Sequence, residues 1–261
     1  MTRDGAAVIP ALIDVHVRVV ANEADGLDYA ALRQAARDVG LDGLVVSLND
    51  SAPPVDDDVA DDVLVFAATE LDTDVGRLVC IPAIVDDWFL HASWRALREG
   101  ELAYSGAAIA AAFGERGGAV LVAQPFDRDL DHEACEGQFV GTANLTGVIV
   151  TSSPRHTTSN ERALDAARQA GLSGVGGSAA GPGNERFGSV ATVFASPPSD
   201  QASLAACLRG GRVWPVEIVT APPALENSDD GENDEDDDRQ RDNGQRDNGQ
   251  RDNGQRDNGQ R

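Results

Sequence analysis

Short apolar runs alternate with segments of helical period along residues 10–220. The apolar runs predict strands at residues 11–17, 44–48, 63–68, 77–81, 119–123, 147–150, 174–177, 188–194 and 212–219. The helical periods predict helices at residues 28–38, 86–98, 105–116, 159–170 and 199–209. Asp28 and Ser199 are the expected N-caps of the first and last helix, and residues 72–76 read as a hairpin turn. The repeated β-then-α order predicts a mainly parallel sheet, either open or closed into a barrel.

The last part of the chain has a different composition. Residues 226–261 contain no apolar residue, and they include Arg-Asp-Asn-Gly-Gln four times in succession, from Arg241 to Gln260. Such a segment cannot bury apolar surface to offset the entropy of ordering, so we expect it to be disordered. The sequence therefore predicts an α/β domain over residues 1–225, followed by a tail that is either a solvated appendage or a solubilising or partner-binding segment.

Charge restricts the classes of partner. The chain has 44 acidic residues against 21 Arg and no Lys, for a formal net charge of -23. The tail holds 13 of the acidic residues and 6 of the Arg, so most of the negative charge belongs to the folded part. A surface of this sign repels nucleic acid and anionic lipid, and we expect neither as a partner. Adaptation to high salt and a GC-rich genome both explain the composition.

Cysteine usage and the N-terminal pattern point to a cytoplasmic protein. The cysteines Cys80, Cys135 and Cys207 are far apart and form no CxxC pair, which favours a reducing compartment. The first residues carry no signal-peptide pattern. The apolar stretch over residues 6–20 is too short and too polar to span a membrane.

Seven segments occur in a fixed order across more than 200 residues. They read IDVHVR (13–18), LDGLVVSLND (41–50), TELDT (69–73), GGAVLVAQPFDR (117–128), NERAL (160–164), GSAAG (177–181) and GGRVWP (210–215). Together they resemble the polymerase-and-histidinol-phosphatase (PHP) family, in its short stand-alone branch. The resemblance implies a distorted (β/α)7 barrel with a metal site at the C-terminal ends of the strands, where barrels generally carry their active sites. It also implies phosphoester hydrolysis assisted by two or three divalent metals.

The ligand positions of that family are mostly lost in this sequence. Of eight positions, His16 and Glu70 keep a ligand, and the other six are occupied by Arg18, Leu48, Asn49, Gln124, Ala179 and Gly181. Aliphatic side chains cannot coordinate, amide oxygens are weak ligands for transition metals, and a guanidinium repels a cation. The resemblance thus implies a degenerate pocket that also includes Asp14 and Ser178, with no catalytic residue assigned.

Three functional hypotheses remain open. The first is a catalytically inactive PHP-like module with a structural or binding role and no cofactor. The second is a weak or altered phosphoesterase that holds one Mn, Zn or Fe at His16 and Glu70, helped by nearby acids such as Asp50, Asp72 and Asp127. The third is a metal-free pocket for a small anion.

The anion pocket of the third hypothesis would be centred on Arg18. Side chains alternate along a strand, so His16 and Arg18 share one face, which the resemblance directs into the pocket. We therefore expect Arg18 to face Glu70, either as a plain salt bridge or as an anion ligand. The remaining histidines, His91, His132 and His156, form no metal-ligand spacing that we recognise.

Overall fold

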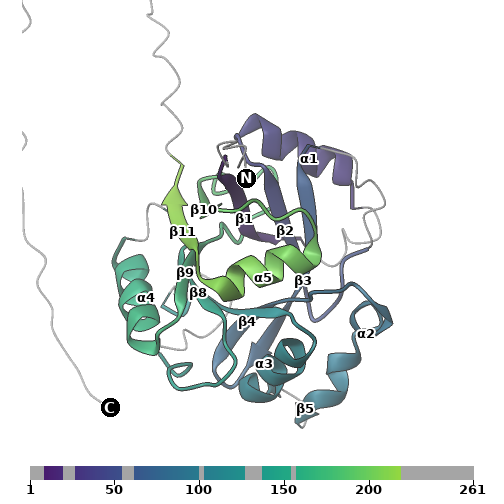
Figure 1. Cartoon of the computed structure of the whole chain (residues 1–261), viewed down its shortest axis with the longest axis vertical. Coiled ribbons are helices and arrows are strands. Elements are labelled where there is room, and N and C mark those ends of the chain that lie inside the picture. Colours follow the sequence, from purple (N-terminus) through teal and green to yellow (C-terminus); the bar gives the residue numbers. More distant parts are fainter. Residues whose placement is uncertain are drawn as a thin grey trace, which may run out of the picture. The chain divides into compact units, whose positions relative to one another are not determined.

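The computed structural model describes residues 9–19, 27–54, 62–99, 103–126, 137–153 and 157–218. These residues form an α/β fold whose mixed sheet is a nearly closed barrel (Figure 1). The strands are β1 (Ala11–Arg18), β2 (Gly43–Asn49), β3 (Leu64–Thr73), β4 (Gly76–Ile81), β5 (Arg98–Glu99), β6 (Ala103–Tyr104), β7 (Ala119–Ala123), β8 (Gly147–Thr151), β9 (Ser173–Gly176), β10 (Val190–Phe194) and β11 (Val213–Glu217). The C-terminal tail, Asp127, Cys135, His132 and His156 lie outside the described residues.

The strand order is β11-β10-β1-β2-β3-β4-β7-β8-β9, with β5 and β6 attached beside β3. Strands β1, β2 and β3 are parallel to one another, as are β7, β8 and β9. The pairs β3–β4, β4–β7, β1–β10 and β10–β11 are antiparallel. The expected α/β barrel is confirmed, but the sheet is mixed rather than mainly parallel, and its path has nine strands rather than seven.

Strand β9, at one end of the strand path, meets β10, the strand next to the other end, through a side chain. The hydroxyl of Thr192 on β10 accepts from the N–H of Gly176 and donates to the carbonyl of Gly176 on β9, both at 2.9 Å. A Cβ at Gly176 would lie 2.3 Å from the carbonyl oxygen of Ala191, so only glycine allows this approach. The barrel is therefore closed here by close packing and one hydroxyl instead of a regular ladder.

Five α-helices and one 3-10 helix accompany the strands in the described residues. They are α1 (Tyr29–Asp38), α2 (Asp87–Leu90), the 3-10 helix η2 (Ser93–Leu97), α3 (Gly106–Glu115), α4 (Thr157–Ala170) and α5 (Gln201–Gly210). Asp28 caps α1 by accepting from Ala31 N–H, as expected. None of the described helices is long and apolar enough to cross a membrane.

Two helix predictions need correction. The helix expected over residues 86–98 is interrupted at Ala92, which has a left-handed backbone with φ of 50°, so α2 and η2 replace it. The N-cap of α5 is Asp200 instead of Ser199. Asp200 accepts from Ser203 N–H at 2.7 Å, and the Ser203 hydroxyl accepts from Asp200 N–H at 3.0 Å, which makes a reciprocal capping box.

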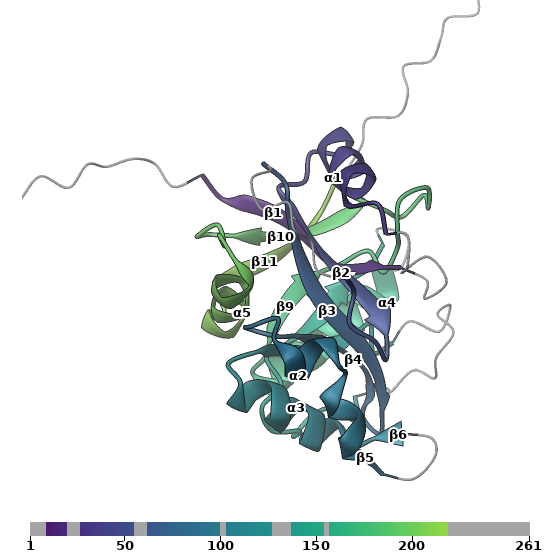
Figure 2. The same cartoon turned by 90° about the vertical axis from the view of Figure 1, so that its right-hand side faces the viewer.

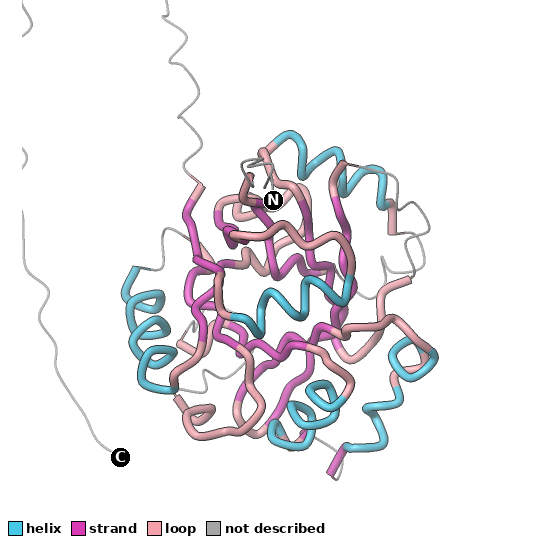
Figure 3. Tube along the Cα trace, in the orientation of Figure 1, coloured by secondary structure: helices cyan, strands magenta, loops and turns pink. Residues whose placement is uncertain are grey.

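Three apolar clusters hold these elements. Helix α5 lies across the opening that the strands enclose (Figures 1 and 3), where Leu204, Ala205 and Leu208 pack on inward residues such as Ile13 and Val45. Helix α1 covers the outer face of β1 and β2. Helices α2 and α3 with η2 cover the outer face of β4 and β7 (Figure 2). Helix α4 packs on β8 as part of the same cluster.

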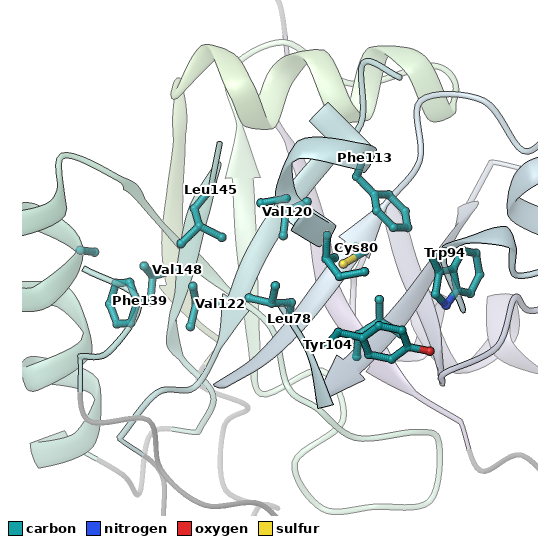
Figure 4. Packing of buried hydrophobic residues seen from close by; sticks show 14 of the residues in the cluster. Leu78, Cys80, Trp94, Tyr104, Phe113, Val120, Val122, Phe139, Leu145 and Val148 are labelled. Carbon is teal, nitrogen blue, oxygen red and sulfur yellow. The ribbon is translucent and has the colours of Figure 1, made fainter. Parts of the chain in front are cut away.

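The largest cluster is built around aromatic side chains. Trp94 and Phe113 are fully buried against Leu78, Cys80 and Val120 of the sheet (Figure 4). The ring centroids of Trp94 and Phe113 lie 5.9 Å apart. This packing fixes η2 and α3 on one side of the barrel, so that the ends of β3 and β4 are held in place.

Candidate functional site

Polar side chains from several strands gather at one end of the barrel, where the parallel strands finish. They are Asp14, His16 and Arg18 on β1, Ser47 on β2, Glu70 on β3, Arg77 on β4, Gln124 just after β7, and Ser178 just after β9. All of them except Arg18 are buried. The expected location at the strand ends is therefore where these residues lie.

Glu70 is the centre of this polar group. Its Oε1 accepts from the Ser47 hydroxyl at 2.7 Å and lies 2.9 Å from Nε2 of His16. Its Oε2 lies 3.7 Å from Nε of Arg18 and 3.7 Å from Nη1 of Arg77. The expected approach of Arg18 to Glu70 is confirmed. One carboxylate thus faces a histidine, a hydroxyl and two guanidinium groups.

The surroundings of Glu70 favour its ionised form. Burial by itself would raise the pKa of this carboxyl, but the charge and hydrogen bond of His16, the charge of Arg18 and the Ser47 hydrogen bond outweigh it and lower the pKa to about 2. Because Glu70 is ionised, Nε2 of His16 is the donor in their hydrogen bond. The two surviving ligand residues are therefore bonded to each other.

Arg77 is the functional-site residue that the sequence reasoning missed. It is only 6% exposed and also binds Asp72, with Nε 2.8 Å from Oδ1. In the β3–β4 hairpin Asp72 pairs with Arg77, and Glu70 lies two residues before Asp72 on the same face. The turn predicted at residues 72–76 combined with strand alternation would have placed Arg77 beside Glu70.

Asp14 is held at an irregular point of β1. The register between β1 and β2 shifts between Asp14 and Val17, so a bulge re-aims the side chains there. Oδ1 of Asp14 accepts from the N–H of His16 at 3.1 Å and of Ser178 at 3.0 Å. Complete burial raises the pKa of this carboxyl to about 6, although hydrogen bonds from Ser178 and His16 act against the shift.

Residues 177–181 run beside the end of β1. The N–H of Ala179 donates to the carbonyl of His16 at 2.8 Å, and Ala179 has a left-handed backbone with φ of 52°. A Cβ at Gly177 would lie 2.7 Å from Cβ of His16, so glycine is needed for this approach. Gln124 donates from Nε2 to the carbonyl of Gly177 at 3.3 Å. The segment therefore joins Asp14, His16, Gln124 and Ser178 into one group.

The residues at this end do not fit a metal cluster of the PHP kind. In the part of the chain that the structure describes, no three His, Cys, Asp or Glu side chains are placed to hold one metal ion. Nε2 of His16 and Oε1 of Glu70 are engaged with each other, and two guanidinium groups face the other carboxylate oxygen. A divalent cation would meet those positive charges directly.

The other acids considered as ligands are engaged elsewhere. Asp50 accepts from the Tyr104 hydroxyl at 2.7 Å and from Trp94 Nε1 at 3.2 Å, and it also pairs with Arg98. Asp72 binds Arg77 as described, and Asp127 is outside the described residues. Asn49 pairs with Glu70 in the β2–β3 register, but its side chain is exposed at the end of β2.

Comparisons with known proteins bear on the fold. No family model matches the sequence, and no curated protein matches it. A crystal structure of PsfC from Pseudomonas syringae is similar, with a TM-score of 0.54 at 16% identity, over 80% of this chain and 91% of that one. A candidate metal-dependent phosphoesterase from Bifidobacterium adolescentis has a TM-score of 0.47 at 17% identity, over 66% of this chain and 89% of that one.

The likeness to PsfC shows that this fold occurs in another protein. At 16% identity it shows a shared fold alone. The chemistry of this chain has to be argued from its own residues, above all from the group around Glu70.

Proposed function

We propose that this chain is a PHP-like protein that acts as a structural or binding module without metal-dependent catalysis. The observation that carries the proposal is the set of partners around Glu70, which are His16 and Ser47 on one oxygen and Arg18 and Arg77 facing the other. These groups supply positive charge and hydrogen bonds to a buried carboxylate from within the protein itself. The strand ends are thereby stabilised without a cation.

The alternative of a phosphoesterase with one metal is less well supported. A catalytic site of the zinc type needs three protein ligands and an open position. His16 and Glu70 are the two remaining ligand residues, and in the 2.9 Å hydrogen bond between them Nε2 of His16 donates to Oε1 of Glu70, which occupies one possible metal-binding atom of each. Freeing them for a metal would break this hydrogen bond and leave Arg18 and Arg77 beside the ion.

An anion pocket centred on Arg18 is also less well supported. The side chain of Arg18 is 29% exposed, which favours such a role. However, three buried acceptor atoms of the described site have no hydrogen-bond partner: Asp14 Oδ2, Glu70 Oε2 and Gln124 Oε1. Acceptor atoms disfavour an anion, because it brings further lone pairs and negative charge.

Hydrolysis assays on the full chain test the proposal. We expect no turnover of p-nitrophenyl phosphate or of its diester with added Mn²⁺, Zn²⁺ or Fe²⁺, and the same background for wild type and His16→Ala. Turnover by the wild type that depends on one of these metals and disappears in His16→Ala would refute the proposal. Thermal unfolding of wild type and Arg18→Ala with added phosphate tests the anion alternative, which predicts stabilisation that Arg18→Ala removes.

A further inference from the structure

A groove of about 220 Å³ lies beside the first half of β3, away from Glu70. Its walls include Tyr29, Pro54 and Val85, and residues 64–67 of β3 form one side. Asp200 and Gln201, at the start of α5, lie at its end. The groove is thus bounded on one side by the backbone of a strand.

Among the described residues, no strand pairs with the second edge of that part of β3. Leu64 N–H donates to the carbonyl of Asp42 at 3.1 Å, and the carbonyl of Glu70 accepts from Asp50 N–H at 2.8 Å. Even-numbered residues of β3 therefore direct their backbone groups toward β2, and odd-numbered residues direct theirs to the other side. On that side the ladder with β4 begins only at Thr69.

Gln201 already occupies one position of this edge. The ladder ends because the next residue of the β4 chain is Pro82, which has no N–H to offer. The carboxamide of Gln201 replaces the missing strand, since Oε1 accepts from Ala67 N–H at 3.0 Å and Nε2 donates to the Ala67 carbonyl at 2.9 Å. An amide group therefore fits this edge with both of its hydrogen bonds.

Val65 is the next odd-numbered residue along the edge. Its N–H and carbonyl point toward the groove by the same alternation, and no group among the described residues bonds to them there. We propose that the groove binds an extended peptide segment of a partner protein, whose backbone pairs with Val65 and continues the edge that Gln201 begins. An apolar side chain of the peptide fills the space between Val65, Val85 and Tyr29.

The negative charge of the protein indicates which residues the bound peptide carries. The carboxylate of Asp200 lies at the end of the groove, its pKa is lowered by hydrogen bonds from Ser203, and the chain carries a net charge of -23. A peptide with apolar residues alternating with Lys or Arg is complementary to these charges and to strand geometry. This site is independent of the role proposed for Glu70.

The test uses the full chain and the synthetic peptide acetyl-Lys-Val-Lys-Val-Lys-Val-amide. Binding is followed by the amide resonances of ¹⁵N-labelled protein, and we expect shifts at Val65, Ala67 and Gln201 with saturation. Val65→Pro removes only an N–H that points away from β2, so the hydrogen-bond ladder between β2 and β3 is retained. It should weaken binding about fivefold to tenfold, whereas Glu115→Gln on exposed α3, outside the groove, should leave it within twofold.

A second peptide keeps the test decisive if Val65→Pro does not fold. The same sequence with alternate backbone nitrogens methylated has the same charge but cannot pair with a strand, and it should not bind detectably. Equal binding of both peptides would overturn the proposal, because attraction of charge alone would explain it. A wild-type dimer in sedimentation that Val65→Pro converts to monomer would also overturn it, since the edge would then serve a second copy.

Discussion

The two ends of the barrel are closed by different chemistry. At the end where α5 lies, buried Leu204, Ala205 and Leu208 pack on the apolar inner face, and Gln201 satisfies the open backbone groups of Ala67. At the other end, the charged side chains of Glu70, Arg18 and Arg77 meet, together with His16. The first closure depends on apolar area, which is additive, while the second depends on partners that must all be present together.

This difference explains why the end of the barrel around Glu70 is polar. Once Glu70 is buried and ionised, each of its partners compensates part of the cost of burying the charge. Loss of any one partner leaves part of that cost uncompensated. We therefore expect substitutions at this end to be strongly coupled, and substitutions beneath α5 to be nearly independent.

The largest expected effect is that of Glu70→Gln. The variant keeps the side-chain volume but leaves Arg18 and Arg77 without the carboxylate that they face, and we expect a loss of about 4 kcal/mol in the free energy of unfolding. Urea denaturation measures it, with Glu115→Gln on the exposed face of α3 as the matched control, expected within about 0.5 kcal/mol of wild type. A loss below about 1 kcal/mol would show that the cluster contributes little to stability.

At the opposite end, Leu208→Ala should cost about 3 kcal/mol, because a fully buried side chain is replaced by a cavity. Leu208→Met preserves the volume and should cost less than about 1.5 kcal/mol. Denaturation of the double variant Leu208→Ala/Glu70→Gln then sharpens the comparison. We expect its loss to equal the sum of the single losses, and a large deviation would show that the two ends are coupled.

The two arginines should differ within the polar end. Arg77 is 6% exposed and Arg18 is 29% exposed, so Arg77 is less screened by water. We expect Arg77→Gln to cost about 2–3 kcal/mol and Arg18→Gln below about 1 kcal/mol, measured by the same denaturation experiment. If Arg18→Gln cost more stability than Arg77→Gln, the hydrogen bond between Arg77 and exposed Asp72 would add nothing to the interaction of Arg77 with Glu70.

The smallest expected effect is that of salt. Residues 1–225 hold 31 acidic residues against 15 Arg, and their mutual repulsion is screened as the Debye length falls to roughly 3 Å at 1 M salt. The melting temperature of the wild type should therefore rise by a few degrees in 1 M KCl. The loss caused by Glu70→Gln should remain, because Glu70 and its partners other than Arg18 are buried. Equal melting temperatures in dilute and molar KCl would favour codon bias as the reason for the acidity.

The sequence predicted elements whose signals are local. The N-cap Asp28 and the apolar face of α1 are such signals, and both are present in the structure. The break at Ala92 is different, because Trp94 turns inward to pack on Phe89 and to donate to Asp50, which a helix continuous over residues 86–98 does not explain. The turn signal at residues 72–76 is also local, and the antiparallel hairpin of β3 and β4 that it predicts is confirmed. The antiparallel placement of β10 beside β1 has no such signal in the apolar runs.

Strand alternation and the family resemblance predicted the positions of some residues of the candidate site. Alternation placed Arg18 beside His16, and both reach Glu70. No pattern in the sequence predicts the bulge at Asp14 or the position of residues 177–181 beside β1. Both depend on tertiary contacts, such as the hydrogen bond from Ala179 N–H to the carbonyl of His16. The position of Arg77 follows from the register of the hairpin predicted at residues 72–76, in which Arg77 pairs with Asp72.

Elemental analysis of the full chain, purified without chelators, tests the central claim most directly. If the ion-pair cluster around Glu70 has replaced the metal site, wild type and His16→Ala should each contain well below one equivalent of Mn, Fe or Zn. Glu70→Gln should give the same low value. One or more equivalents in the wild type, lost in both His16→Ala and Glu70→Gln, would show that these residues still hold a metal and would contradict the account.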